Sequence, residues 1–499
     1  MQQPIPIDVP FPLGGVNKAT GYTDQPQGTM PAALNVWPLE YPGGRRHGGV
    51  RPGLTSSGFP GADPYNWCKV SWPSGDGIAV ATENGTYVTT NGSTWNLRIA
   101  TAPSSDFATC TSLNSVLFQS YLGASSIKYY DLEAGSGGDV TASAGTVPTK
   151  CGIVYARGGR LFAAGDEDNP HVLYASAVND YTDWDYSIPD EGAAWKSSGT
   201  TGHINRPIVG AIEHGNGCFL IGHTDAITII RGDPQIGGSG AIELLDNFAG
   251  PVMQSAWCKT GADDTVVLTR EELSLIKSGC GTPRITMSRY KLPDELAAVD
   301  PGNGDRASVA YDGRWNGVFI FIARNNGEDY DYSQFFFDIG GEGFWPMEFT
   351  AGEFTLGVTM EKVLSQTRGS VIALKNGAGK YFDTESTESI DSYAWVPIPI
   401  GGPITDGQLT RLTAILAEDS DPVDYDLYFG MSFHEAYNST ARRSGTWERA
   451  GLNYSIHPRG SGNACYAKLS GSGTDRWSVE RLLGEVHPVS ARRVLKNAP

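Results

Sequence analysis

Residues 78–90 read IAVATENGTYVTT: an apolar run, a polar turn containing Asn84-Gly85, and a second run of strand-forming residues. Two such runs joined by a short polar turn predict a β-hairpin, and Asn-Gly is a preferred turn dipeptide. The same plan recurs in CFLIGHTDAITIIRGD (218–233), TVVLTREELSLIKSG (265–279) and VIALKNGAGKYFD (371–383). A single hairpin is only marginally stable in water, so these units must stack around a common core. The sequence therefore predicts an all-β protein built from repeated small sheets.

A β-propeller suits such units best, because it arranges small antiparallel sheets radially and leaves only short protected edges. A large sandwich and a β-helix are the alternatives. The composition favours short strands joined by tight turns, since the chain holds 63 Gly and 30 Pro and only 18% charged residues. The one segment with a helix-like start is 293–299, where Pro293 and Asp294 can open a turn. We predict a β-propeller-like domain over residues 55–394.

The two terminal regions depart from the repeat plan. Residues 1–54 contain the turn-rich stretch YPGGRRHGGVRPGL, which predicts an extended N-terminal arm or first strands. Residues 395–499 contain alternating runs such as QLTRLTAILAE and ACYAKLSG, which predict an additional C-terminal β-sandwich-like domain.

The formal net charge of −18 disfavours tight nucleic-acid binding, because an acidic surface repels the phosphate backbone. An acidic wall is nevertheless compatible with a conduit through which DNA slides. Residues 1–12 lack the basic start and the apolar core of a signal peptide, and no apolar run reaches the length of a membrane span. We therefore expect a protein that is made in a cytoplasm and has no membrane span.

The cysteines indicate neither a disulfide framework nor a zinc site, because they are scattered, odd in number and without a CxxC pair. We expect most of them to be small buried hydrophobic side chains. The seven are Cys68, Cys110, Cys151, Cys218, Cys258, Cys280 and Cys465.

Among the polar residues we find no motif for catalysis or for a metal. The eight histidines include none beside a GxSxG nucleophile elbow, and FHEAYN at Phe433 lacks the second His of a zinc-binding HExxH helix. Acidic clusters at 166–169, 300–305 and 419–426 fit no EF-hand, so we expect solvated turns there. We predict no catalytic residue, no cofactor and no metal, and a protein that is not an enzyme.

Glycan hydrolysis is the enzymatic alternative, because acidic pairs on propellers cleave glycans. The turns around Trp95 and Trp447 resemble the Asp-box of propeller sialidases, but both lack its acidic residue at the right offset. We therefore interpret both turns as structural.

Several phrases along the chain resemble those of one protein family. A Gly-Gly-x-Asn element and an Arg-Pro-Gly turn near the N-terminus involve Gly14, Gly15, Asn17, Asn35, Arg51, Pro52 and Gly53. Farther on, LYASAVNDYTDWDYS (173–187) carries Trp184, and TDAITIIRGDP (224–234) ends with Arg231 and Asp233. IHPRGSGNACYAKLSG (456–471) and RWSVERLLGEVHPVSARR (476–493) follow in the same order as closing strands. The set resembles podovirus-type tail nozzle proteins, the family of tail tubular protein B and of packaged-DNA stabilisation proteins.

This resemblance implies a structural virion protein of a bacteriophage tail that is assembled in the host cytoplasm. It implies a ring of subunits, usually a homo-hexamer, attached below the portal and adaptor and in contact with other tail proteins. Genomic DNA would pass through its lumen without sequence-specific binding, and the ring would help to close the exit until ejection. The motif residues named above are then candidates for assembly contacts.

Two alternatives remain open, a propeller-based receptor- or glycan-binding tail protein and a glycan hydrolase. Aromatic loops at 181–186 and 344–346 are possible contact anchors, since Trp and Tyr dominate interface hot spots. Each such Trp taken alone is more often part of a core.

Overall fold

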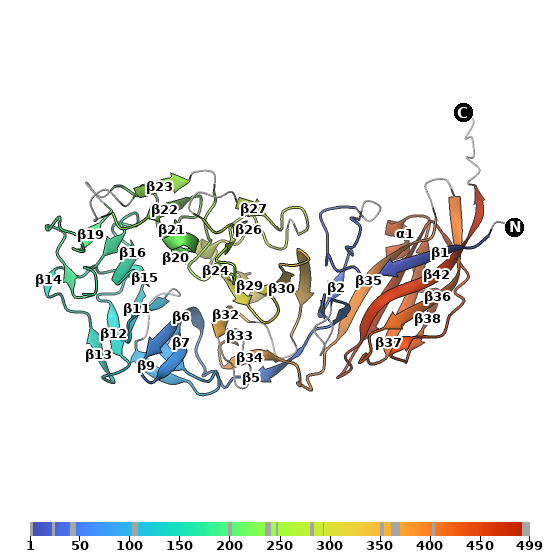
Figure 1. Ribbon diagram of the computed structural model, residues 1–499, viewed down its shortest axis with the longest axis horizontal. Coiled ribbons are helices and arrows are strands. Elements are labelled where there is room, and N and C mark those ends of the chain that lie inside the picture. The colour runs from blue at the N-terminus through green and yellow to red at the C-terminus, as the bar shows by residue number, and fades with distance from the viewer. Residues whose placement is uncertain are drawn as a thin grey trace, which may run out of the picture.

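The computed structural model describes residues 3–491 except 22–24, 40–45, 102–107, 198–201, 235–240, 246–247, 280–283, 293, 350–353, 361–369 and 402–404. A ring of small sheets lies at one end of the molecule, and two larger sheets lie at the other (Figure 1). The regular helical elements of the described residues are α1 (Phe433–Tyr437) and two 3-10 turns, Gly215–Gly217 and Pro301–Asn303. The prediction of an all-β fold is confirmed.

Seven antiparallel four-stranded sheets form the ring. The first three blades are β6 (Pro64–Trp72), β7 (Gly75–Thr82), β8 (Gly85–Thr89) and β9 (Asn96–Ala100); β10 (Ala108–Leu113), β11 (Val116–Tyr121), β12 (Lys128–Asp131) and β13 (Ser136–Asp139); and β15 (Cys151–Arg157), β16 (Arg160–Asp166), β17 (Tyr174–Ala175) and β19 (Trp195–Lys196). A short parallel pair, β14 (Ala144–Gly145) and β18 (Asp183–Trp184), sits beside the third blade.

The next three blades follow the same order along the chain. They are β20 (Gly210–His214), β21 (Cys218–Gly222), β22 (Ile227–Arg231) and β23 (Ala241–Leu245); β24 (Trp257–Lys259), β25 (Thr265–Leu268), β26 (Leu273–Ile276) and β27 (Arg284–Thr286); and β28 (Arg306–Asp312), β29 (Gly317–Asn325), β30 (Tyr330–Asp338) and β31 (Gly343–Met347). The seventh combines β32 (Leu356–Met360), β33 (Ser370–Lys375) and β34 (Ala378–Asp383) with β5 (Gly53–Ser56) from near the N-terminus.

The first strand of each blade contacts the first strand of the next, and β32 of the seventh blade contacts β6 of the first, so the ring is closed. The outer position of the seventh blade is filled by β5, whose Leu54 pairs with Phe382 of β34. The ring is therefore closed by pairing between β5, at the N-terminal end of the propeller segment, and β34, at its C-terminal end. This closure removes the free edge that an incomplete last sheet would expose.

Side-chain hydrogen bonds to backbone groups join neighbouring inner strands. Thr109 Oγ1 donates to the carbonyl of Gly152 over 3.0 Å, which links the second and third blades. Ser255 Oγ donates to the carbonyl of Ala307 over 2.6 Å, which links the fifth and sixth blades. These bonds satisfy backbone groups that point sideways from each sheet, and they fix each blade against its neighbour.

The other unit is a sandwich of two sheets. The five-stranded sheet has the order β2 (Ala33–Leu34), β35 (Ser392–Pro399), β41 (Ala464–Gly471), β37 (Val423–Gly430) and β38 (Arg443–Trp447). The seven-stranded sheet has the order β3 (Val36–Trp37), β4 (Gly48–Val50), β42 (Ser478–Ala491), β36 (Thr405–Leu416) and β39 (Gly451–Leu452), with β1 (Ile5–Pro10) on β42 and β40 (Gly460–Gly462) on β36. The α1 helix contacts β37 and β41, and its N-cap Ser432 accepts the amide of Glu435.

The segment predicted as an extended arm or first strands, 1–54, runs as strands that belong to both units. Strands β1 to β4 lie in the sandwich and β5 lies in the seventh blade. The segment is thus not a separate part of the molecule.

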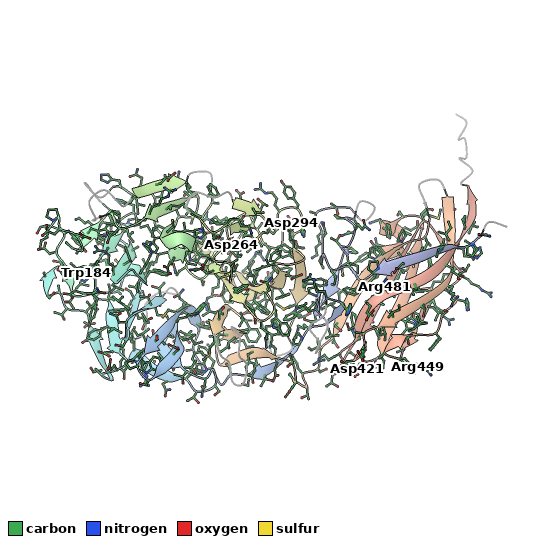
Figure 2. The ribbon with its side chains drawn as sticks, viewed as in Figure 1. Trp184, Asp264, Asp294, Asp421, Arg449 and Arg481 are labelled. Atoms are coloured by element: carbon green, nitrogen blue, oxygen red, sulfur yellow. The ribbon has the colours of Figure 1, made fainter. Side chains whose placement is uncertain are left out.

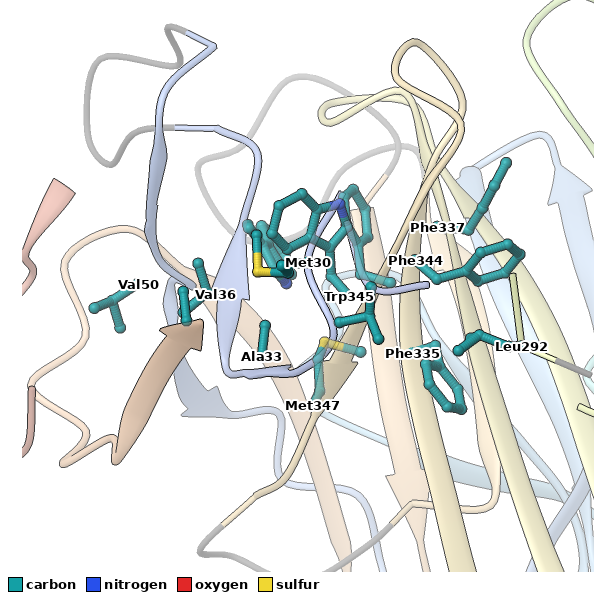
Figure 3. Close-up of a cluster of buried hydrophobic side chains, with 14 of the residues drawn as sticks. Met30, Ala33, Val36, Val50, Leu292, Phe335, Phe337, Phe344, Trp345 and Met347 are labelled. Atoms are coloured by element: carbon teal, nitrogen blue, oxygen red, sulfur yellow. The ribbon is translucent and has the colours of Figure 1, made fainter. Parts of the chain in front are cut away.

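One hydrophobic core continues from the last blades through the N-terminal segment into the sandwich. Trp37 of β3 stacks on Phe336 of β30 with ring centroids 4.4 Å apart. Met30 and Val36 of the same segment face the β31 side chains at the joint (Figure 3). Burial of this apolar surface makes separation of propeller and sandwich costly.

Two local predictions are wrong. The helix expected at 293–299 is absent from its described residues, where 294–296 form a turn. Ala298 has φ +60°, which a right-handed helix does not allow, and its amide donates to the carbonyl of Arg270. Instead, α1 begins at Phe433. Cys218 is disulfide-bonded, a bond that cysteine spacing does not reveal.

Candidate binding site at the propeller axis

A hollow of about 430 Å³ opens on the propeller axis, at the end where the first strands begin. Every blade contributes to its wall, so no single loop encloses it. Each blade, together with its connections, supplies at least one lining residue. In chain order these include Tyr65, Leu122, Ile153, Val209, Met253, Arg306 and Thr355. Ligand pockets in proteins commonly have volumes of roughly 300–1,000 Å³ and apolar walls. The volume of the hollow lies within that range.

The wall is largely apolar. Ile208, Val252, Met253 and Ala307 line it and are almost fully buried. Leu122 lies at the rim and remains 39% exposed. A partner that covered this rim would therefore gain free energy from burying apolar surface.

Arg306 supplies the charged part of the wall. Its Nη1 lies 3.3 Å from Asp63 Oδ2, and its guanidinium lies over the rings of Tyr65 and Tyr330 at 5.2 Å and 5.6 Å. Arg306 begins the sixth blade, and Asp63 directly precedes the first. The seventh blade lies between these two blades, so the ion pair spans the start of its first strand, β32. The charge is balanced locally, and the contact stiffens the mouth.

Asp305 has a structural role in the same wall. Its two carboxylate oxygens accept the backbone amides of Asp300 (2.8 Å) and Asn325 (2.9 Å), and the side chain is buried. Asp300 in turn caps the 3-10 turn by accepting the amide of Gly302. Both carboxylates beside the hollow, Asp63 and Asp305, are therefore engaged in holding the wall together.

The first group of predicted motif residues fastens the N-terminal segment to the sixth blade. Gly15 has φ +69° and forms a parallel bridge with Phe344; a Cβ there would lie 2.5 Å from the Phe344 carbonyl oxygen. Gly14 donates its amide to the Gly28 carbonyl at 2.7 Å. Asn17 is buried, and its Oδ1 accepts amides from its own loop while Nδ2 donates to the Tyr290 carbonyl.

The second group forms the joint between propeller and sandwich. Arg51 is 1% exposed and donates to Asn35 Oδ1 (3.0 Å) and to Glu388 Oε2 (3.2 Å), besides the carbonyl of Pro52. Burial lowers the pKa of Arg51, and the carboxylate of Glu388 opposes that shift. Gly53 begins β5, and a Cβ there would lie 2.7 Å from Ser386 Oγ.

The remaining motif residues hold blades together. Trp184 is fully buried between the second and third blades, in the part of the propeller far from the sandwich (Figure 2). Arg231 pairs with Glu243 in its own blade. Asp233 accepts from Arg160 Nε over 2.8 Å and so ties the fourth blade to the third.

None of the ten motif residues lines the axial hollow. The residues that do line it come from many separate connections and share no motif, so sequence reasoning missed them. The one available signal was the repeat itself, because a closed ring of sheets has an axis, and ligand sites in ring-shaped folds gather where the blades converge.

The two Asp-box-like turns are structural, as predicted. Asn91 Oδ1 accepts the amides of Ser93 and Thr94, and Trp95 Nε1 donates to the Ser57 carbonyl. Trp447 is fully buried in the sandwich.

The net negative charge is confined to one part of the chain. Residues 395–499 contain 11 Lys and Arg and 11 Asp and Glu, so the net charge of −18 belongs entirely to residues 1–394. The propeller is therefore strongly acidic, whereas the sandwich is close to neutral.

In the described part of the chain, no cluster of three or more His, Cys, Asp or Glu side chains is arranged to hold a metal ion. Among the same residues, none of the helices has the length and apolar character needed to cross a membrane. Four of the five described free cysteines are buried, in agreement with the prediction, and burial raises the pKa of Cys258 to about 12.

No protein-family model matches the chain, and no curated protein sequence matches it either. Solved structures with a similar chain path include YCF48 bound to D1 peptide, which has 10% identity, coverage of 68% of this chain and 97% of that one, and a TM-score of 0.40. The extracellular domain of a hybrid two-component system from B. thetaiotaomicron has 10% identity, coverage of 92% and 62%, and a TM-score of 0.45. A catalytically inactive virginiamycin B lyase from Staphylococcus aureus has 12% identity, coverage of 66% and 99%, and a TM-score of 0.39. Likenesses of this size carry no argument about function, and the propeller is established by its own seven sheets.

Proposed function

We propose that this chain is a propeller-based binding protein without catalytic activity, and that the axial hollow receives its ligand. The observation that carries the proposal is the hollow of about 430 Å³, to which all seven blades contribute and whose wall is mainly apolar. The supporting contacts are fixed without a ligand, since Asp305 and the Arg306–Asp63 pair hold the wall. Such preorganisation lowers the entropic cost of binding.

Binding of the neutral apolar dye Nile red tests the hollow as a ligand site. We expect saturable binding that is lost in Val209→Trp, because Val209 is half-buried in the wall and an indole there would fill the space. Val178→Trp is the matched control, since Val178 is 37% exposed and lies in a connection at the opposite end of the ring. Equal binding by wild type and Val209→Trp, or no binding at all, contradicts the proposal.

A second candidate is the tail nozzle subunit that the sequence resemblance implies. The observation that favours it is the confinement of all net negative charge to residues 1–394, since an acidic lumen wall repels a DNA backbone.

Negative-stain imaging of the purified chain tests this candidate. A ring of six copies with the propellers facing the lumen supports it. A monomer over a wide concentration range contradicts it and leaves the single-chain binding protein.

A further inference from the structure

We infer that the partner of the axial hollow is a cationic polypeptide that inserts one apolar side chain into it; this inference rests on the proposed function. It joins two separate observations, the apolar wall of the hollow and the charge of the connections that surround it.

The wall selects an apolar group over an anion. The guanidinium of Arg306 is paired with Asp63 at 3.3 Å, and Tyr65 and Tyr330 cover it. An incoming carboxylate or phosphate would have to displace Asp63 and those rings, whereas an apolar side chain need only contact Leu122 and its apolar neighbours at the mouth.

The surrounding connections select positive charge. In each blade the link between the second and third strands lies at the same end as the hollow, and all seven links are described. Together they hold a single basic residue, Arg270, and eight acidic ones: Glu83, Glu167, Asp168, Asp225, Glu271, Glu272, Glu328 and Asp329. A cleft ringed by one sign of charge attracts ligands of the opposite sign and speeds their association.

Cations from other connections neutralise only part of this ring. Lys150 pairs with Asp168, and Arg206 pairs with Asp225. Arg289 pairs with both Glu271 and Glu272. Glu167 and Glu328 are exposed on the same links, so the end of the propeller with the hollow remains acidic. A lysine- or arginine-rich segment with an apolar residue at its centre matches both features.

Peptide binding to the full chain tests the inference. The probe is a fluorescent peptide with a central Leu flanked by Lys residues; its controls replace Leu by Ser, or every Lys by Glu. We expect the Leu-Lys peptide to bind about tenfold or more tightly than the Ser-Lys peptide, because burial of a Leu side chain is worth at least that factor. The Glu peptide should not bind, and added salt should weaken the Leu-Lys complex.

Matched variants locate the complex. Leu122→Ser should lower affinity severalfold, whereas Leu97→Ser should not, because Leu97 is 44% exposed on the outer strand β9. Glu167→Gln with Glu328→Gln should weaken binding, whereas Glu133→Gln with Glu191→Gln, which are exposed in connections at the opposite end, should not.

The outcomes separate this inference from the proposed function. Nile red binding that Val209→Trp abolishes, together with no preference for the Leu-Lys peptide, overturns the partner class and leaves the ligand site. Preferred binding of the Glu peptide, of an oligosaccharide or of single-stranded DNA likewise overturns the partner class. Absence of Nile red binding to the wild-type chain overturns the proposed function itself.

Discussion

Replacement of Arg51 by Met should destabilise the whole molecule, because Arg51 joins propeller to sandwich. The substitution removes the bonds to Asn35 (3.0 Å), to Glu388 (3.2 Å) and to the Glu348 carbonyl (3.1 Å), as well as the stacking over Phe349 at 4.6 Å. The Glu388 carboxylate, whose side chain is 10% exposed, would lose its ion-pair partner and keep the Leu54 amide at its Oε2 atom. Removal of one member of a buried ion pair costs about 3–5 kcal/mol.

The assay is urea unfolding followed by tryptophan fluorescence. We expect Arg51→Met to lower the free energy of unfolding by about 3–5 kcal/mol. In a Glu388→Gln background the same change should cost less by roughly 1–3 kcal/mol, since no charge is then left uncompensated. Arg98→Met is the control, because Arg98 is exposed on β9. A loss from Arg51→Met no larger than that from Arg98→Met, or no coupling with Glu388, would refute the assignment of Arg51 as the joint.

Three further predictions concern the backbone, the pH response and the core. Gly15→Ala should lower the free energy of unfolding by about 2–4 kcal/mol, since the new Cβ would overlap the backbone of β31. Gly28→Ala should lower it by only about 1–2 kcal/mol, because Gly28 has φ +77° but no atom lies within 4 Å of the position of its Cβ. Urea titration measures both. Burial lowers the pKa of His214 and of His223 below the ordinary 6.5, so the unfolded chain binds these protons at a higher pH than the folded chain does. The contribution of these groups to stability should therefore be full above about pH 6.5 and fall as the pH drops below it. The double variant His214→Gln/His223→Gln should flatten this pH dependence in thermal melts between about pH 5 and 7. Trp184→Ala should lower stability by about 3–5 kcal/mol and leave Leu-Lys peptide affinity unchanged in the folded fraction, because this indole is core and lines no part of the hollow.

Local sequence signals were sufficient to predict the hairpins. Residues 371–383 form β33 and β34 with Lys375 paired to Ala378, so Asn376 and Gly377 are the turn residues. In 78–90 the register is displaced by one: Thr82 pairs with Gly85, and the turn residues are Glu83 and Asn84. A dipeptide preference identifies a turn but does not fix its register, because pairing along the whole strand decides it.

Pairing between distant segments could not be predicted in this way. The β5 strand meets β34 across a sequence separation of 328 residues, as in the bond from Thr55 to Asp383. Short extended segments rich in Gly and Pro carry no pattern that names a partner strand. For the same reason the sequence left residues 1–54 open between an extended arm and first strands, and it did not show which sheets these strands join. The axial hollow was equally inaccessible, since it exists only once seven separate connections converge.

The N-terminal segment explains why the hollow can stay open without a ligand. It closes the seventh blade with β5, fastens Gly15 to the sixth blade, and adds strands to both sheets of the sandwich. Opening the ring would therefore require breaking sheet pairing at β5 and, at the same time, the Arg51 contacts and the core around Trp37. A wall held so firmly cannot close around a ligand, so recognition must depend on shape and charge already present at the mouth.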